Sequence, residues 1–322
     1  MSRIHEALKK AEQERAAAQG VAPPGVAPPL ANETAEITLG PPDGSQAAVR
    51  DFSGGVPLSV AMPSFSGAFS LENLLARCSS LPWNPDQRTM LFFNGDEGAR
   101  GTEEFRTLRS RLYHTREKMP LKKILVTSAL PKEGKSFTAA NLAQVLVRQH
   151  GRRVLLVDAD LRAPRLHMML GTNSSPGLSD YLQGGSDEIS IMQRGPMESL
   201  FFIPCGAEIS DPSELVANGR LQLLLQRVEA LFDWIIIDSP PAVPVSDASV
   251  LAKACDGVLL VVRSNSTPVD MARRARQEFP DQALVGVVLN GTENQAVPYT
   301  RYYYDNNDNK LNHDKKTNES KR

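Results

Sequence analysis

The sequence has 322 residues, of which 41% are hydrophobic and 23% charged, with a formal net charge of −1. It is long enough for one full domain with extensions, and so small a net charge gives no strong attraction to nucleic acid or to an anionic membrane. The cysteines Cys78, Cys205 and Cys255 are scattered without a C-x-x-C pair, which argues against a disulfide framework and a zinc or iron–sulfur site and favours a reducing, cytoplasmic setting. No apolar run reaches the roughly 18–20 residues of a transmembrane helix, and no signal peptide is evident. We therefore expect a soluble protein that reaches a membrane only through a partner.

Residues 1–16 predict a short helix, because apolar residues recur there at helical spacing. So short a helix is marginal in water, so the segment is either a fraying end or a helix that docks on a partner. Residues 17–66 are rich in Ala, Pro and Gly and contain few large apolar side chains. Such a segment buries too little surface to offset its ordering entropy, so we expect a disordered linker.

Residues 67–100 give a mixed pattern, and we expect a poorly defined extension of the domain that follows. The stretch FSLENLLARC, residues 69–78, predicts one or two turns of helix. The stretch TMLFF, residues 89–93, precedes Asn94-Gly95 and predicts a short strand ended by a turn.

Short, nearly continuous apolar runs then recur through residues 101–291, which we take as one domain. These runs are KKILVTSAL (122–130), RRVLLVDAD (152–160), SLFFIPCG (199–206), DWIIIDSPP (233–241), DGVLLVVRS (256–264) and ALVGVVLNG (283–291). Runs that are apolar on both faces indicate strands of a parallel sheet. Helical segments such as 136–149 and 213–231 separate them, so the predicted fold is a doubly wound, mostly parallel α/β sheet with helices on both faces.

The stretch SALPKEGKS, residues 128–136, predicts a phosphate-binding loop of variant form. A loop of the form G-x-x-x-x-G-K-[ST] would begin with glycine, but Ala129 stands there before Gly134, Lys135 and Ser136. The loop nevertheless lies between a predicted strand and a predicted helix, so free amide groups and the helix dipole would point at a phosphate. Lys135 would then reach the β- and γ-phosphates of a nucleotide, and the Ser136 hydroxyl would bind Mg²⁺.

Three aspartates support a nucleotide site over an ordinary turn. Asp158 and Asp160 end one buried run, and Asp238 ends another. Ligands of open α/β sheets bind at the carboxyl ends of the strands, so these carboxylates and the phosphate loop should converge on one edge. An aspartate alone is often only a strand terminus or a helix cap, but this combination predicts a site for Mg²⁺ and a nucleotide.

These motifs resemble the bacterial tyrosine kinases (BY-kinases) of exopolysaccharide assembly, within the MinD/ParA-like P-loop ATPases. The resemblance covers residues 101–304 and rests on SALPKEGKS, LLVDADLR and IIIDSPP. Similar proteins carry S-x-x-P-x-x-G-K-[ST], D-x-D-x-R and D-x-P-P motifs, so the missing first glycine is normal in this family. The opening MSRIHEALKKAEQER further resembles the tyrosine autokinases associated with exosortase systems. The family fold is the doubly wound sheet already expected.

The resemblance implies a role for each site residue. Asp158 is expected to accept the proton of a tyrosine hydroxyl, while Asp160 and Asp238 hold Mg²⁺ directly or through water; the roles of Asp158 and Asp160 are interchangeable at this stage. Lys135, Asp158 and Asp160 form the expected catalytic set. Arg162 completes D-x-D-x-R and either stabilises the site or is an ordinary surface arginine. Asn290 either contacts adenine, as in related ATPases, or is a turn residue before Gly291.

The predicted nucleotide contacts include residues 131–137, which cover most of the loop and the start of the helix after it. They are Pro131, Lys132, Glu133, Gly134, Lys135, Ser136, Phe137, Arg162 and Asn290. Lys132 stands where the family often has glycine; a non-glycine residue forced to positive φ costs about 1–2 kcal/mol. Lys132 therefore either has an allowed conformation or adds a cation beside the nucleotide. The ordered region lacks an N-K-x-D guanine motif, so ATP is favoured over GTP.

The stretch TEEFRTLRSRLY, residues 102–113, predicts a helix with Thr102 as its N-cap. Its core-facing stripe is Phe105, Leu108 and Leu112. Three charged residues, Glu103, Arg106 and Arg109, step by three along a separate polar flank. Such a flank is usually solvated, but E-x-x-R-x-x-R resembles the motif through which BY-kinase subunits assemble into rings, so we favour oligomerisation.

Four of the six tyrosines of the chain lie in VPYTRYYYDNN. They form the tyrosine cluster: Tyr299, Tyr302, Tyr303 and Tyr304. The surrounding residues 292–322 are polar and predict a disordered tail, although one or two of the tyrosines would pack on the domain in a purely structural interpretation. The resemblance implies that the cluster is the autophosphorylation site. About a dozen extended residues reach about 40 Å, enough for a neighbouring subunit's site.

The function implied is an ATP- and Mg²⁺-dependent tyrosine autokinase that phosphorylates its tail in trans and regulates exopolysaccharide synthesis or export. The implied partners are an integral-membrane chain-length determinant as activator and a tyrosine phosphatase, with no nucleic acid. The protein would be cytoplasmic and peripheral to the inner membrane. A ParA/MinD-like ATPase switch is the alternative, but Leu130 replaces the signature lysine of that group. A scaffold that uses nucleotide only to assemble is disfavoured by the intact Lys135 and aspartates.

Overall fold

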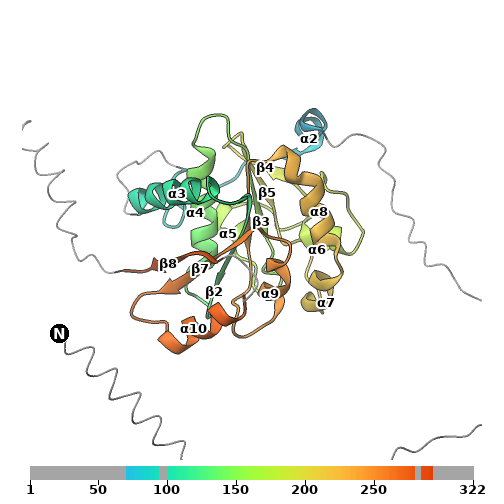
Figure 1. The fold of residues 1–322 in the computed structure, drawn as a ribbon. Helices are drawn as coiled ribbons and strands as arrows, with labels where there is room; N and C mark the ends of the chain where they lie inside the picture. Colours follow the sequence, from blue (N-terminus) through green and yellow to red (C-terminus); the bar gives the residue numbers. More distant parts are fainter. Residues whose placement is uncertain (1–69, 94–100, 280–283, 293–322) are drawn as a thin grey trace, which may run out of the picture. The chain divides into compact units, whose positions relative to one another are not determined.

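The computed structural model describes residues 70–93, 101–279 and 284–292 (Figure 1). Predictions about the helix at 1–16, the linker at 17–66 and the tyrosine cluster lie outside these residues. Within them, no helix is both long enough and apolar enough to cross a membrane.

The described residues form one eight-stranded sheet in the order β1-β4-β5-β3-β6-β2-β7-β8 (Figure 1). The strands are β1 (Ser79–Ser80), β2 (Lys123–Ser128), β3 (Val154–Asp158), β4 (Gln193–Arg194), β5 (Leu200–Ile203), β6 (Trp234–Asp238), β7 (Gly257–Arg263) and β8 (Leu284–Asn290). Only β4 and β5 pair antiparallel. Each of the predicted apolar runs contains one strand, and the mostly parallel sheet is confirmed.

Helices cover both faces of the sheet, as a doubly wound fold requires (Figure 1). The helices are α2 (Leu71–Arg77), α3 (Thr102–Arg116), α4 (Lys135–Val147), α5 (Leu166–Leu170), α6 (Leu178–Leu182), α7 (Pro212–Ala217), α8 (Arg220–Val228), η1 (Glu229–Leu231), α9 (Asp247–Ala252) and α10 (Val269–Gln277). Buried side chains of α3, α4 and α5 join one apolar cluster, and those of α6 to α10 join the other.

The strand side chains alternate between these two clusters. In β6, Trp234 and Ile236 lie in the cluster with α4, while Ile235 and Ile237 lie in the cluster with α8. Because all four are fully buried, the strand has no solvated face. This explains the continuous apolar runs, which would alternate with polar residues if one face met water.

The strand predicted at TMLFF is wrong. Residues 87–93 form turns whose backbone bonds to the side chains of α4 instead of joining the sheet. The Asn141 carbonyl oxygen accepts from the Leu91 amide at 2.9 Å, and the Gln144 carbonyl oxygen accepts from the Phe92 amide at 3.3 Å. The apolar side chains Met90 and Phe92 are nevertheless buried. Residues 70–93 thus belong to the same compact unit as the sheet.

Two local details of the predicted helices are also wrong. The helix expected at 213–231 is divided into α7, α8 and η1, and the break between α7 and α8 lies at Gly219, whose φ of +80° is left-handed. Thr102 is the first residue of α3 and not its cap; the cap is Gly101, also at positive φ. Phe105 and Leu112 are buried as predicted, and Leu108 is half-buried against the same cluster.

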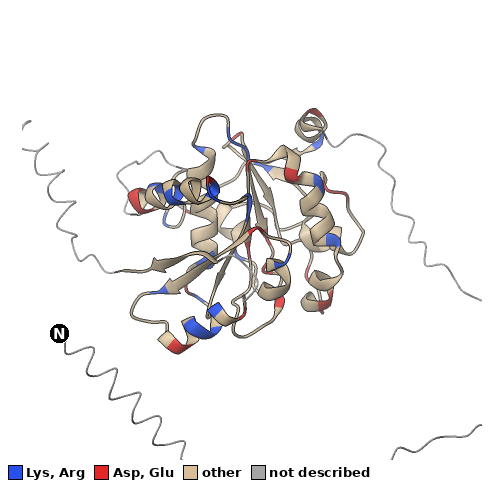
Figure 2. Ribbon diagram, viewed as in Figure 1, with Lys and Arg blue, Asp and Glu red and all other residues tan. Residues whose placement is uncertain are grey.

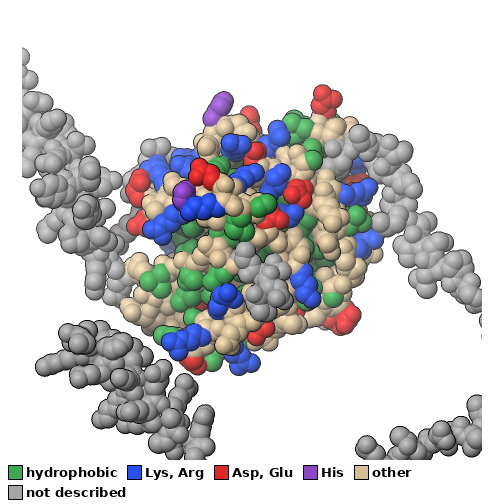
Figure 3. All heavy atoms as spheres, viewed as in Figure 1, with side chains coloured by type: hydrophobic (Ala, Val, Ile, Leu, Met, Phe, Trp, Pro, Cys, Tyr) green, Lys and Arg blue, Asp and Glu red, His purple; other side chains and the backbone are tan. Residues whose placement is uncertain are grey.

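Strand β8 lies at one edge of the sheet and leaves apolar side chains exposed. Val287 is 57% exposed and Leu289 is 58% exposed, and Val269 at the start of α10 is 66% exposed. Figure 3 shows hydrophobic side chains gathered on this face of the molecule. Apolar side chains gathered on a surface mark a place where another segment or molecule binds.

Candidate nucleotide and phosphoryl-transfer site

The sheet register brings the predicted aspartates together. β3 and β6 are neighbours, and Asp158 pairs directly with Asp238 across them. β2 is the other neighbour of β6, with Val126 beside Asp238, and the chain enters the phosphate loop two residues later at Ser128. The carboxyl ends of these three strands therefore form one edge, as expected.

Lys135 lies among these carboxylates. Its Nζ is 2.6 Å from Asp160 Oδ2, and the side chains are 11% and 2% exposed. Burial alone would lower the pKa of Lys135, but Asp238, Asp160 and Asp158 together raise it. Lys135 is thus firmly protonated, and it neutralises part of a buried negative cluster.

Asp158 is fully buried and already hydrogen bonded. Its Oδ1 accepts from the Asp160 amide at 3.3 Å, and its Oδ2 accepts from the Leu166 amide at 3.1 Å. Burial, followed by the charge of Asp238, raises the pKa of Asp158 well above its usual range. A raised pKa makes the carboxylate a better proton acceptor. Each oxygen accepts one backbone hydrogen bond and keeps a second acceptor position, so a tyrosine hydroxyl would share the carboxylate with these amides.

Asp238 differs because both of its carboxylate oxygens are buried without a hydrogen-bond partner in the described structure. Burial raises the pKa of Asp238 to about 6, against the opposing effects of Lys135 and the nearby Ser136 hydroxyl. Buried carboxylates are normally paired or coordinate a metal. The orphaned oxygens beside Ser136 fit Mg²⁺, which binds one or two carboxylates together with substrate phosphates. Among the described residues, no group of three His, Cys, Asp or Glu side chains forms a metal cage.

The phosphate loop is held by the buried carboxylate of Glu133. Its Oε2 accepts from the Leu130 amide at 2.8 Å within the loop. Its Oε1 accepts from the hydroxyl of Thr267, which lies between β7 and α10. The Glu133 side chain thus fixes the loop to the segment that follows the neighbouring strand, and its predicted contact with a nucleotide stays a prediction.

Two backbone positions of the loop have positive φ. Lys132 has φ +66°, so the loop keeps the left-handed conformation although glycine is absent, and its carbonyl accepts from Arg263 Nη1 at 3.0 Å. Gly134 has φ +97°, and a Cβ there would lie 1.9 Å from Asn290 Nδ2. The Asn290 amide donates to the Glu133 carbonyl at 2.9 Å, while its oxygen accepts from the Gly291 amide. Asn290 therefore braces the loop in this structure.

The other loop residues predicted to contact the nucleotide differ in how exposed they are to solvent. Pro131 and Lys132 are exposed, whereas Ser136 is 8% exposed at the start of α4. The Phe137 ring packs edge-on against Phe105 of α3 with centroids 5.9 Å apart. The Phe137 side chain thus supports the packing of α3 on α4, and a contact with a nucleotide would have to come from the Phe137 backbone.

Arg162 is bound on one side by α9 and α7. Its Nε donates to Asp247 Oδ2 at 2.7 Å, and its Nη2 donates to Ser213 Oγ at 2.6 Å and to Asp247 Oδ1 at 3.3 Å. The Asp160 carboxylate holds the same turn, because its Oδ1 accepts from the Ala163 amide at 3.0 Å. Arg162 is therefore an ordered part of the edge and not a free surface arginine.

The predicted residues Glu103, Arg106 and Arg109 lie in α3, where Figure 2 shows Lys and Arg concentrated, and we call them the α3 triad. Arg106 forms an ion pair with Glu103 within the helix. Arg109 Nη1 donates to the Val145 carbonyl near the end of α4 at 3.1 Å. The triad thus has contacts within the chain, and its role in assembly stays a prediction.

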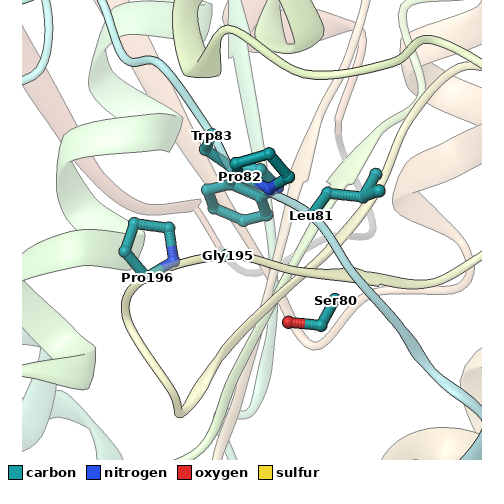
Figure 4. Close-up of a pocket in the computed structure, with 6 residues that line it drawn as sticks. All are labelled: Ser80, Leu81, Pro82, Trp83, Gly195 and Pro196. Carbon is teal, nitrogen blue, oxygen red and sulfur yellow. The ribbon is translucent and has the colours of Figure 1, made fainter.

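Two hollows lie away from the predicted site residues. One, of about 520 Å³, lies where Trp83 packs over Gly195 between Pro82 and Pro196 (Figure 4). The other, of about 290 Å³, borders α7. Neither is lined by the phosphate loop or by Asp158, Asp160 and Asp238.

Sequence reasoning missed the residues that support the site. Arg263 is the last residue of β7 and Thr267 lies four residues further on, so their place at a strand's carboxyl end was a usable signal. Asp247 and Ser213 begin short helices, where such residues are ordinarily helix caps, so nothing in the sequence distinguished them.

Comparisons with known proteins agree with this geometry. A family model described as an AAA domain matches residues 122–270. The tyrosine-protein kinase YwqD of Bacillus subtilis (strain 168) is 33% identical over 211 residues, which are 65% of this chain and 88% of that protein. The tyrosine-protein kinase wzc of Salmonella typhimurium is 31% identical over 204 residues, which are 63% of this chain but 28% of that protein.

A solved structure shares both fold and sequence. The kinase domain of the Escherichia coli tyrosine kinase ETK superposes with a TM-score of 0.59 at 28% identity, covering 68% of this chain and 91% of that domain. The match to YwqD spans nearly all of a relative, and the fold, the loop and the carboxylates occupy one matched region. The chain therefore belongs to the bacterial tyrosine-protein kinases, enzymes that transfer a phosphate from ATP to tyrosine.

Proposed function

We propose that this protein is an ATP- and Mg²⁺-dependent autokinase that phosphorylates its own tyrosine cluster between subunits, and that it thereby regulates exopolysaccharide synthesis or export. The observation that carries the proposal is the edge at which Lys135, the orphaned Asp238 carboxylate and the start of α4 meet. A cation, a pair of free carboxylate oxygens and a helix N-terminus are what a Mg²⁺–nucleotide complex requires.

In this proposal each residue has a distinct task. The loop amides and Lys135 bind the phosphates, with Lys135 exchanging its present partner Asp160 for phosphate oxygens. Ser136, Asp238 and Asp160 would hold Mg²⁺, whose charge offsets that of the phosphates during transfer. Asp158 accepts the tyrosine proton, which its raised pKa favours, with Asp160 as the alternative.

Transfer between subunits is supported by the position at which the tail leaves the domain. β8 ends at Asn290, beside the phosphate loop, so the tail starts at the nucleotide edge. The exposed apolar side chains of β8 and α10 support self-association, as does the α3 triad. If the subunits form a ring in which one tail enters a neighbour's site, that arrangement accounts for the position of the tail and for the surfaces that support self-association.

The partners proposed are a membrane-embedded chain-length determinant, which activates the kinase, and a phosphatase, which resets it. Both rest on the family resemblance, and the chain spans less than a third of the length of wzc. Phosphates each add about −1.5 to −2 charges, so a phosphorylated cluster would be repelled by the site carboxylates. The ring would loosen, and autophosphorylation would limit itself.

The test uses the purified full chain with ATP and Mg²⁺. Phosphotyrosine should form, and mass spectrometry should locate it on the tyrosine cluster. A variant with all four cluster tyrosines changed to phenylalanine should lose most of the label while binding ATP normally. Label that persists on other tyrosines would contradict the cluster as the acceptor, whereas a wild type that hydrolyses ATP without forming phosphotyrosine would return the ATPase-switch alternative.

A further inference from the structure

Three loops meet at the carboxyl edge of the sheet and build a network around Arg162. β3 lies between β5 and β6, so the segments that follow these strands are neighbours. Arg162 follows β3, Ser213 lies in the helix after β5, and Asp247 begins the helix after β6. The sheet order thus brings together three residues that are up to 85 positions apart in sequence.

The network holds one side of the guanidinium group. Nε and Nη2 of Arg162 both donate to Asp247, and Nη2 also donates to Ser213. The Ser213 hydroxyl itself donates to Asp247 Oδ1 at 2.8 Å, which fixes the serine as well. Nη1 makes no hydrogen bond to any residue that the structure describes.

The burial of Asp247 shows that this is more than a surface ion pair. Asp247 is 2% exposed while the Arg162 side chain is 38% exposed. A buried carboxylate needs a permanent partner, whereas a partly exposed arginine retains donors for a ligand. Asp160, two residues before Arg162, bonds Lys135 directly and its charge acts on Arg162, so the arginine lies at the same edge as the phosphate loop.

We propose that Asp247 is a positioning residue: together with Ser213 it orients the Arg162 guanidinium so that Nη1 binds an oxygen of the phosphoryl group in transfer. The inference rests on the proposed kinase function. A fixed cation stabilises charge that grows in the transition state without reorganising, whereas an unrestrained arginine would sample many rotamers. Asp247 touches neither nucleotide nor tyrosine and acts only through Arg162.

The experiment is a double-mutant cycle on the full chain, with phosphotyrosine formation measured at saturating ATP and Mg²⁺. R162A and D247N should each lower kcat on the order of 100-fold, the effect of removing one transition-state donor. The ATP KM should change little. The double variant should be no slower than R162A alone, because Asp247 has no route to the reaction once Arg162 is gone.

The matched control is R152A. Arg152 pairs with Asp233 at 2.8 Å just before β3 and β6, at the opposite ends of the same two strands. Its loss breaks an Arg–Asp pair of similar geometry away from the site and should leave kcat unchanged. Independent, multiplicative losses for R162A and D247N would overturn the proposal, as would an R162A enzyme with wild-type kcat.

If D247N fails to fold, a second double-mutant cycle tests the same proposal. S213A removes only a hydroxyl and should lower kcat about 3–10-fold, the effect of one hydrogen bond. The double variant of S213A and R162A should again be no slower than R162A alone. Full additivity there overturns the proposal. An inactive wild type would instead overturn the kinase function itself, so the two failures are distinguishable.

Discussion

The buried carboxylate of Asp238 should make the nucleotide-free protein less stable at neutral pH than at mildly acidic pH. Folding raises its pKa from 3.8 to about 6, so the ionised form is disfavoured in the folded state. At about 1.4 kcal/mol per pKa unit, this corresponds to about 3 kcal/mol of lost stability above pH 7. The cost is fully present above the folded pKa and is relieved as pH falls toward the unfolded pKa. Between pH 7.5 and pH 5 the relief amounts to about 1.4 kcal/mol.

D238N removes this titration while keeping the shape of the side chain. Its absolute stability is a poor readout, because an unpaired amide at the same place costs about 1–3 kcal/mol. The informative quantity is the change with pH: urea unfolding at pH 7.5 and pH 5 should show wild type gaining about 1.4 kcal/mol relative to D238N. The loss of one charge also lowers the pKa of Asp158, which widens the difference.

D233N is the matched control, because Asp233 immediately precedes the strand that Asp238 ends. Burial raises the pKa of Asp233, but the Arg153 amide and the Arg152 side chain lower it by more. The net shift is therefore opposite in sign to that of Asp238. Its contribution is present above its unfolded pKa and is lost only at lower pH, so D233N should be less stable than wild type by a similar amount at pH 7.5 and pH 5. Equal pH dependence in wild type and D238N would refute the reasoning.

Three further outcomes are expected. K135M should abolish phosphotyrosine in a gel-blot assay and, because it strips Asp160 of its buried partner, should cost about 3–5 kcal/mol of stability in urea unfolding; wild-type labelling would contradict the site. Replacing the α3 triad by alanine should leave a monomer by light scattering, and an unchanged mass would return this flank to an ordinary solvated surface. T267V should weaken ATP binding at least about 10-fold by calorimetry, since a hydrogen bond to the loop's Glu133 carboxylate is worth about 1.5–3 kcal/mol; an unchanged affinity would show that this brace is unnecessary.

The parts of the fold that follow from local pattern were predictable. The apolar runs marked the strands of the parallel core because burial on both faces leaves no polar alternation. The phosphate loop and the aspartates were found because their chemistry lies at strand ends in the sequence itself. Strand order then brought Asp158 beside Asp238, as the edge argument required.

Features that depend on distant partners were not predictable. The stretch TMLFF has the composition of a strand, but the side chains of Asn141 and Gln144 in α4 bind its backbone amides, and it joins no strand of the sheet. The two-residue strands β1 and β4 are too short to leave a period in the sequence. The supports of the site, Glu133 to Thr267 and Arg162 to Asp247, join residues far apart in the chain, and single residues carry no sign of such pairing.

The claim at the centre of this account is that one subunit phosphorylates the tail of another. The direct measurement mixes two complementary variants: K135M, which is inactive but keeps the tyrosine cluster, and the chain with all four cluster tyrosines changed to phenylalanine, which keeps an active site but lacks these acceptors. With ATP and Mg²⁺, we expect phosphotyrosine on the K135M chains, resolved by a size tag, while neither variant labels alone. If both chains stay unlabelled in the mixture while wild type labels strongly, transfer occurs within one chain and the proposal of transfer between subunits is contradicted.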